Sequence, residues 1–387
     1  MRELKNLKIG IDARITGYRE GGISRYGRSL AQALASIDTS DQFTIFQNWR
    51  HRESILPAGA NLTTSYLFTP PHHRWEQWTL PLELSFHRVD LLHSIDFIPP
   101  FHRPCASVIT VHDLAFVRMP NIMTEDSLRY YMQVGKAAKN TDGIIADSEV
   151  TRKDIVDLLG VSARHIDVIY PGIDSIFTPL DKEQVQRFCH DKGLPPSFIF
   201  WVSTIEPRKN LEVLLEAMSL IRAKLPSEKR TLVVAGAQGW LSDDTISKLS
   251  SLQSSGDAIY LGQVSQEDLL HLYNAAWVFI FTSQYEGFGL PPLEAMACGT
   301  PVISSNAPAM PEVLGEAPLY FPHSAPTALA ERILSLAEDE SLEKELYQAG
   351  LKQAARYTWD NTAQQTLEVY HKAYCGSRPD YNQKAKA

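Results

Sequence analysis

The sequence predicts an α/β protein with two doubly wound domains, and three observations lead to this prediction. The chain has 387 residues, which is more than one hydrophobic core usually supports. Short apolar runs of strand length alternate with longer stretches of helical periodicity. A turn-rich segment separates two such series. Strands and helices in alternation favour parallel sheets covered by helices on both faces.

The first series predicts a domain over residues 1–178. Its helices are expected at Ser24–Ile37 and Glu125–Lys139, where apolar residues recur with helical spacing. Its strands are apolar, rich in β-branched residues and bounded by polar residues or glycine. They are expected at Leu7–Ile11, Phe43–Phe46, Asp90–Ile95, Ser107–Val111, Gly143–Ala146 and Ile166–Tyr170.

The second series predicts a domain over residues 179–358. Pro171-Gly172 and Thr178-Pro179 mark the linker before it, because proline and glycine favour turns. A helix is expected around Leu211–Leu225. The strands are expected at Phe198–Val202, Thr231–Ala235, Ile259–Gly262, Val278–Phe281, Val302–Ser304 and Leu319–Phe321.

The end of the chain predicts one further helix, at about residues 359–375. Ala363, Leu367, Tyr370 and Tyr374 have near-helical spacing there. Residues 376–387 are polar and contain lysine, so this tail is expected to fray.

Composition excludes several classes of protein. The net charge of −8 offers no basic footprint for nucleic acid. The four cysteines are scattered and form no Cys-x-x-Cys pair, which argues against a zinc site or a disulfide framework. No apolar run reaches membrane-spanning length, and the N-terminus does not resemble a signal peptide. We therefore expect a cytoplasmic protein.

The most informative segment runs from Glu286 to Glu294. It places two carboxylates eight positions apart around the turn Gly287-Phe288-Gly289, and prolines then open a helix. Glycines let a backbone approach a ligand, and the free N–H groups of a helix N-terminus favour an anion. The segment therefore predicts a ligand that carries both hydroxyl groups and phosphate.

A second segment places Arg208 and Lys209 between a predicted strand and a predicted helix. Two adjacent cations at such a junction can neutralise a diphosphate, since arginine offers a planar fork and lysine a point charge. The surrounding Glu206-Pro207-Arg208-Lys209-Asn210, together with Glu286-x7-Glu294, resembles the motifs of the retaining family-4 glycosyltransferases. This resemblance implies the GT-B fold: two facing Rossmann-like domains with a cleft between them, and a final helix that crosses back to the first domain.

The resemblance also implies roles for residues of the second domain. Arg208 and Lys209 would bind the diphosphate of a nucleotide sugar, and Glu286 would bind the hydroxyls of its sugar. The other donor-binding residues would be the backbone of Phe288, Gly289 and Leu290 at sugar and phosphate, Glu294 at the ribose, and the main chain of Val264 at the base.

In the first domain, Gly21 and Gly22 precede a helix and can bring N–H groups to a phosphate. His112 follows a strand and, by resemblance, would lie beside the donor sugar. Asp113 would either orient His112 or contact the acceptor. Ser148 is expected to cap a helix.

These residues predict a retaining hexosyltransferase that uses a nucleotide-diphosphate sugar. UDP-glucose is the first choice of donor and GDP-mannose the second. The acceptor would be a carbohydrate or a lipid-linked saccharide, in polysaccharide or glycan biosynthesis. No Asp-x-Asp pair follows a strand, so neither a metal nor another cofactor is expected. A nucleotide-sugar epimerase or a phosphorylase on the same fold, and a non-catalytic saccharide-binding protein, are the alternatives.

One helical stripe admits two interpretations. Trp75, Trp78, Leu82 and Phe86 share one helical face. We expect this face to pack in the core or between domains, in preference to a membrane surface. Weak peripheral contact with the inner face of a membrane stays open as the other interpretation.

Overall fold

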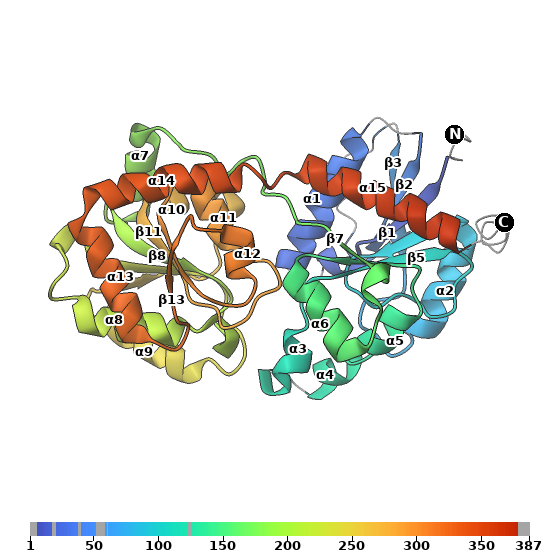
Figure 1. The fold of residues 1–387 in the computed structure, drawn as a ribbon, viewed down its shortest axis with the longest axis horizontal. Helices are drawn as coiled ribbons and strands as arrows, with labels where there is room; N and C mark the ends of the chain where they lie inside the picture. Colours follow the sequence, from blue (N-terminus) through green and yellow to red (C-terminus); the bar gives the residue numbers. More distant parts are fainter. Residues whose placement is uncertain are drawn as a thin grey trace. The chain divides into compact units, whose positions relative to one another are not determined.

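A computed structural model describes residues 6–17, 21–37, 40–51, 59, 61–122 and 125–377. Most of the tail that is expected to fray, residues 378–387, lies outside these described residues. The chain divides into two compact units. One comprises Met1–Gly172 and Thr358–Ala387, and the other comprises Ile173–Tyr357. Figure 1 shows that each unit contains a sheet with helices packed around it.

The first unit has a seven-stranded parallel sheet with the order β3-β2-β1-β4-β5-β6-β7. Successive strands are added on one side of β1 as far as β3, and on its other side from β4 onward. The order therefore reverses between β1 and β4. The strands are β1 Lys8–Asp12, β2 Gln42–Asn48, β3 Leu62–Leu67, β4 Leu91–Ser94, β5 Ala106–Val111, β6 Gly143–Ala146 and β7 Ile166–Val168.

The helices of the first unit include the last helix of the chain, α15. This helix packs against α1, β5 and β6, and its Tyr370 hydroxyl lies 2.7 Å from Nδ1 of the buried His93. The helices are α1 Gly22–Ser36, α2 Glu76–His87, α3 Ala115–Arg118, α4 Glu125–Tyr131, α5 Val134–Lys139, α6 Glu149–Leu159 and α15 Trp359–Gly376, with short 3-10 helices η1 Arg14–Gly17, η2 Pro120–Ile122 and η3 Ala163–His165.

The second unit repeats this design with a six-stranded parallel sheet of order β10-β9-β8-β11-β12-β13. The order reverses between β8 and β11. The strands are β8 Phe198–Val202, β9 Leu232–Ala235, β10 Ala258–Tyr260, β11 Ala276–Phe281, β12 Val302–Ser305 and β13 Leu319–Phe321.

Helices cover the sheet of the second unit, and one buried cluster of this unit includes residues of α8, α13 and the strands. The helices are α7 Lys182–Lys192, α8 Leu211–Ile221, α9 Asp243–Ser254, α10 Gln266–Ala275, α11 Leu290–Ala297, α12 Met310–Leu314, α13 Pro326–Glu338 and α14 Glu340–Ala354, with 3-10 helices η4 Pro207–Lys209 and η5 Ser227–Lys229.

The boundary between the units lies six residues before the expected position at 178/179. The reason is that the intervening residues bond to the second unit. The Ile173 N–H donates to the Tyr357 carbonyl over 3.0 Å. The Phe177 ring lies 5.7 Å from the ring of Tyr273.

Two elements differ from those expected in the first domain. Strand β3 at the sheet edge is not predicted, because only its end residues Leu62 and Leu67 are buried and its middle is polar or exposed. The helix expected at Glu125–Lys139 is divided into α4 and α5. The Gln133 N–H donates to the Tyr130 carbonyl three residues earlier, so the helical ladder tightens into a turn.

The expectation that the stripe on α2 packs in the core is wrong. Trp75, Trp78, Leu82 and Phe86 are 54%, 75%, 64% and 78% exposed. The helix buries Leu80 and Leu84 on its other side instead.

Among the described residues, no helix combines the length and apolar character needed to cross a bilayer.

Candidate functional site

The carboxyl ends of β8 and β11 lie side by side at the point where the strand order of the second unit reverses. In open α/β sheets, ligands bind at this position. Two hydrogen bonds join the loops that follow the strands. The Gln284 N–H donates to the Arg208 carbonyl over 2.9 Å, and the Thr282 hydroxyl donates to the Lys209 carbonyl over 2.7 Å. The two loops therefore form one connected structure.

A short 3-10 turn positions the two cations predicted by the sequence. Arg208 and Lys209 lie in η4, directly before α8. Asn210 ends the turn in the left-handed conformation, at φ 55°, which asparagine tolerates better than most residues. Its side-chain amide donates to the His323 carbonyl over 2.7 Å and holds the turn against the loop after β13.

Glu286 lies between these cations. Lys209 Nζ is 2.5 Å from Glu286 Oε1, and Arg208 Nη1 is 3.3 Å from Glu286 Oε2. Arg208 also pairs with Glu206, at 3.1 Å from Nη2. The side chains of the cations and of Glu286 retain only 10–16% exposure. The group is therefore a partly buried cluster of two cations and two carboxylates.

The electrostatic balance of the cluster keeps Glu286 ionised. Burial raises the pKa of this carboxyl, but the adjacent Lys209 and Arg208 lower it further, so that its pKa lies below the ordinary value. An ionised carboxylate accepts hydrogen bonds and has no proton to donate. Glu286 is thus suited to bind hydroxyl groups.

The glycine turn leads directly into helix α11. Gly289 precedes this helix with φ 93°, and a Cβ added there would lie 2.7 Å from the Met310 Cε. The positive φ favours glycine, whereas the Met310 side chain could move to admit a Cβ. Pro291 and Pro292 follow in the first turn of the helix. Phe288 is buried, with its ring 5.5 Å from the ring of Tyr357.

Glu294 and Val264 belong to other elements than the two loops that carry the ion cluster. Glu294 is buried within α11, and its Oε2 accepts a hydrogen bond from the Tyr273 hydroxyl at 3.0 Å. Val264 is half-buried in the loop between β10 and α10. The structure thus joins Arg208 and Lys209 directly to Glu286.

In the first unit, His112 directly follows β5 and uses both ring nitrogens. Nδ1 lies 2.7 Å from Asp147 Oδ2, and Nε2 lies 2.9 Å from the Ile95 carbonyl. Burial lowers the pKa of His112, but the charge and hydrogen bond of Asp147 outweigh this effect and raise the pKa to about 9. The residue that orients His112 is therefore Asp147, whereas Asp113 accepts a hydrogen bond from the Ala115 N–H at 2.9 Å.

The two glycines at the start of α1 have no local structural requirement. Gly21 has φ −177°, an extended conformation open to any residue. A Cβ at Gly21 or Gly22 would meet no atom within 4 Å. Neither the conformation of the two glycines nor their packing against the described residues thus explains why glycine occurs there. Ser148 caps α6 as predicted, since its Oγ accepts from the Thr151 N–H at 3.0 Å.

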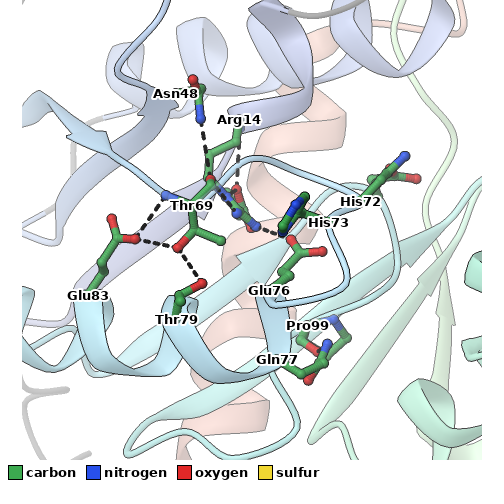
Figure 2. Close-up of polar contacts among 12 residues, drawn as sticks. Arg14, Asn48, Thr69, His72, His73, Glu76, Gln77, Thr79, Glu83 and Pro99 are labelled. Carbon is green, nitrogen blue, oxygen red and sulfur yellow. Dashed lines mark hydrogen bonds and ion pairs between the residues drawn. The ribbon is translucent and has the colours of Figure 1, made fainter.

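Sequence reasoning missed a buried ionic cluster at the reversal point of the first unit. Arg14 follows β1 and pairs with Asp12 at 2.7 Å and with Glu76 of α2 at 2.5 Å. Arg14 also donates to the Thr69 carbonyl over 3.0 Å, and Figure 2 shows Thr69 and Glu76 beside Arg14. The Tyr130 hydroxyl donates to the other oxygen of Glu76 at 2.8 Å.

A small cavity adjoins this cluster. Its lining includes Arg14, Glu76 and, at the end of β4, Ser94 and Asp96. Ser94 Oγ and Asp96 Oδ1 are buried and have no hydrogen-bond partner among the described residues, while the other oxygen of Asp96 binds His72. Polar residues directly after β1 and β4 are the sequence signal that could have identified this site.

Among the residues that the structure describes, no group of three or more histidine, cysteine, aspartate or glutamate side chains is arranged to hold a metal ion.

Comparison with known proteins identifies both units. Residues 20–176 match the model of the family described as "Glycosyltransferase Family 4", and residues 182–353 match "Glycosyl transferases group 1". The O-antigen chain mannosyltransferase B of Escherichia coli is 32% identical over 90% of this chain and 95% of its own length. A D-inositol 3-phosphate glycosyltransferase of Streptomyces bingchenggensis is 29% identical over 92% and 86%.

Solved structures show the same fold. Sucrose-phosphate synthase from Thermosynechococcus elongatus aligns with a TM-score of 0.77 and 20% identity, over 96% of this chain and all of the other. Anabaena HepE in complex with UDP-glucose aligns with a TM-score of 0.74 and 18% identity, over 94% and 99%. The chain belongs to the group 1, family-4 glycosyltransferases and has the GT-B fold.

Proposed function

We propose that this glycosyltransferase moves a hexose from a nucleotide-diphosphate sugar to a saccharide or lipid-linked saccharide acceptor in glycan biosynthesis. The observation that carries the proposal is the position of Arg208 and Lys209. They lie beside Glu286 where the strand order of the second unit reverses. This position supplies cations for a diphosphate and an ionised carboxylate for sugar hydroxyls.

The reaction needs positive charge at the leaving group. When the bond between the sugar and the phosphate breaks, negative charge develops on the departing diphosphate, and fixed cations stabilise that charge. Arg208 and Lys209 would exchange part of their contact with Glu286 for contact with the diphosphate. Glu286 would accept hydrogen bonds from the sugar, because its lowered pKa leaves it without a proton to donate.

We also propose that transfer retains the anomeric configuration and needs no bound metal ion. The cation pair supports the second part, because it provides the charge that a divalent cation would otherwise supply. Activity should persist after treatment with EDTA. A loss of activity that added Mg²⁺ or Mn²⁺ restores would contradict metal independence, and NMR of the product's anomeric proton tests retention.

The acceptor would bind through the cavity of the first unit. Ser94 Oγ and Asp96 Oδ1 are buried there without a partner in the part of the chain that the structure describes, and unsatisfied buried polar atoms are costly. An acceptor hydroxyl could donate to Asp96 and accept from Ser94. The variant Ser94→Ala should then raise KM for the acceptor and leave donor affinity unchanged. Equal KM values in variant and wild type would contradict this assignment.

The names of similar proteins favour one donor sugar over the other. The O-antigen chain mannosyltransferase B, one of the relatives that align over most of both chains, is named a mannosyltransferase, whereas the UDP-glucose complex belongs to a protein of 18% identity. We therefore propose mannose, carried as GDP-mannose, ahead of UDP-glucose, which reverses the order predicted from the sequence.

A donor panel tests the proposed activity. The chain is incubated with GDP-mannose, UDP-glucose and related nucleotide sugars, with and without a mannose-containing oligosaccharide acceptor. Mass spectrometry of the acceptor and release of nucleoside diphosphate are then measured together. We expect both to rise with GDP-mannose. Isomerised donor without acceptor extension, or donor binding without turnover, would contradict hexosyl transfer.

A further inference from the structure

Helix α2 is apolar on two opposite sides, although it lies at the surface of the first unit. Its inner side buries Leu80 and Leu84 in a cluster with Phe46, Leu67 and Leu92. Its outer side presents the exposed side chains of the stripe defined by Trp75, Trp78, Leu82 and Phe86. A helix that is apolar all round normally has partners on all sides. The inner side has the sheet as its partner, whereas the outer side has none among the described residues.

The outer side forms one continuous strip. Trp75 at the start of α2 and Trp78, Leu82 and Phe86 within it are spaced by three or four residues, which places them on one helical face. Phe68 extends this strip, since it is 69% exposed and its N–H donates to Glu83 of the helix over 2.6 Å. We call Phe68 and these four residues the α2 strip.

The two acidic residues of α2 both bind groups of the protein itself. Glu76 is buried against Arg14. Glu83 accepts from the N–H groups of Phe68 and Thr69 at 2.6 and 2.9 Å. Figure 2 shows Glu76 turned toward Arg14 and Glu83 turned toward Thr69.

Three arginines lie beside the α2 strip, and their side chains are exposed to solvent. The Arg74 guanidinium lies 5.4 Å from the Trp75 ring centroid, and Arg88 directly follows the helix. Arg50 lies 5.8 Å from the Trp49 ring, which in turn contacts Phe68. All three arginines are exposed. The border of the α2 strip is therefore cationic.

We propose that the α2 strip binds the surface of a lipid bilayer that contains anionic lipids. Tryptophan, leucine and phenylalanine on one face with arginines at its edge are the composition of helices that lie in the membrane interface. The aromatic and aliphatic side chains enter the boundary between headgroups and acyl chains, and the arginines contact anionic headgroups. A second copy of the chain fits less well, because a symmetric contact would bring the same arginines together.

This placement would serve the proposed reaction if the acceptor is lipid-linked, and this step rests on the proposed function. Glu76, on the inner side of α2, lines the cavity that also contains Ser94 and Asp96. Trp75, its neighbour in sequence, belongs to the α2 strip. A bilayer at the strip would therefore present saccharide headgroups close to the proposed acceptor cavity.

Vesicle binding without any substrate tests the proposal independently of catalysis. The full chain is mixed with phosphatidylcholine vesicles with or without 30% phosphatidylglycerol, at about 0.05 and 0.5 M salt, and the bound fraction is measured by sedimentation. We expect binding to the anionic vesicles that weakens at high salt. Burial of one large apolar side chain corresponds to about tenfold or more in partition. The double variant Trp78→Gln/Phe86→Gln should therefore bind at least about tenfold more weakly.

Matched variants separate the contributions. Leu220→Gln/Leu241→Gln removes two exposed apolar side chains from the second unit and should bind as the wild type does. Arg74→Gln/Arg88→Gln should lose the preference for anionic vesicles. Circular dichroism melting verifies that each variant is folded.

The outcomes decide the proposal. Absence of binding to every vesicle, or equal binding by wild type and Trp78→Gln/Phe86→Gln, would overturn it. A concentration-dependent dimer that this variant loses, without vesicle binding, would assign the strip to a second copy instead. Donor turnover with a soluble acceptor should stay the same in the variant, so a failure here leaves the proposed transfer activity intact and separately testable.

Discussion

Replacement of Glu286 by glutamine tests how the ion cluster is balanced. Glu286→Gln keeps the shape of the side chain and removes its charge. Arg208 would keep Glu206 at 3.1 Å as its partner, whereas Lys209 would lose the carboxylate at 2.5 Å. The net charge of this partly buried cluster of two cations and two carboxylates would change from zero to +1.

The magnitude follows from this burial. Breaking one partner of a buried ion pair costs about 3–5 kcal/mol, and we take about 3 kcal/mol because the Lys209 side chain keeps 16% exposure. A change of 1 kcal/mol shifts the melting temperature of a domain of this size by about 2–4 °C. Glu286→Gln should therefore melt roughly 6–12 °C below the wild type.

A diphosphate should reverse much of this loss. Pyrophosphate supplies the missing negative charge, so it should raise the melting temperature of Glu286→Gln more than that of the wild type. Differential scanning calorimetry with and without pyrophosphate measures both values. Glu212→Gln is the control, since Glu212 forms an exposed pair with Lys248, and exposed pairs contribute little. Equal melting of Glu286→Gln and wild type, or equal stabilisation by pyrophosphate, would refute the reasoning.

Three further predictions concern folding and pH. His112 has a pKa of about 9 in the folded protein and about 6.5 in the unfolded chain. At ~1.4 kcal/mol per pKa unit, its protonation adds about 3 kcal/mol to the free energy of unfolding; this stabilisation is complete below about pH 6.5 and disappears as pH rises through about 9. Urea titrations at about pH 6 and 9.5 should show this difference for the wild type and no such difference for His112→Gln. Gly289→Ala should destabilise the second unit by about 1–2 kcal/mol because φ is positive there, and thermal melting that matches the wild type would contradict this. Ser148→Ala should cost about 1 kcal/mol through loss of the helix cap, with Ser148→Asp as the variant that restores stability.

The sequence revealed the buried strands well for a physical reason. A central parallel strand is covered on both faces, so it appears as a continuous apolar run. The strands predicted at Gly143–Ala146 and Phe198–Val202 have the same bounds as β6 and β8 in the structure. Strand β3 was missed because an edge strand that buries little, such as Leu62–Leu67, lacks such a run.

Contacts between distant residues limited the prediction of the sites. The motif around Glu286 was legible because glycines, prolines and carboxylates occur close together in sequence. Arg14 and Glu76 are 62 residues apart, and no local pattern joins them. The stripe on α2 was visible as a pattern, but helical spacing does not distinguish burial in the core from exposure to another apolar partner.

The central claim is that Arg208 and Lys209 bind the diphosphate of the donor. Isothermal titration calorimetry with GDP and with guanosine, on the wild type and on Arg208→Ala/Lys209→Ala, tests it most directly. A hydrogen bond to a charged group contributes about 1.5–3 kcal/mol, so loss of both cations should weaken GDP binding by about 100-fold or more. Guanosine affinity should stay the same. GDP affinity within threefold of the wild-type value, or an equal loss for guanosine, would contradict the account.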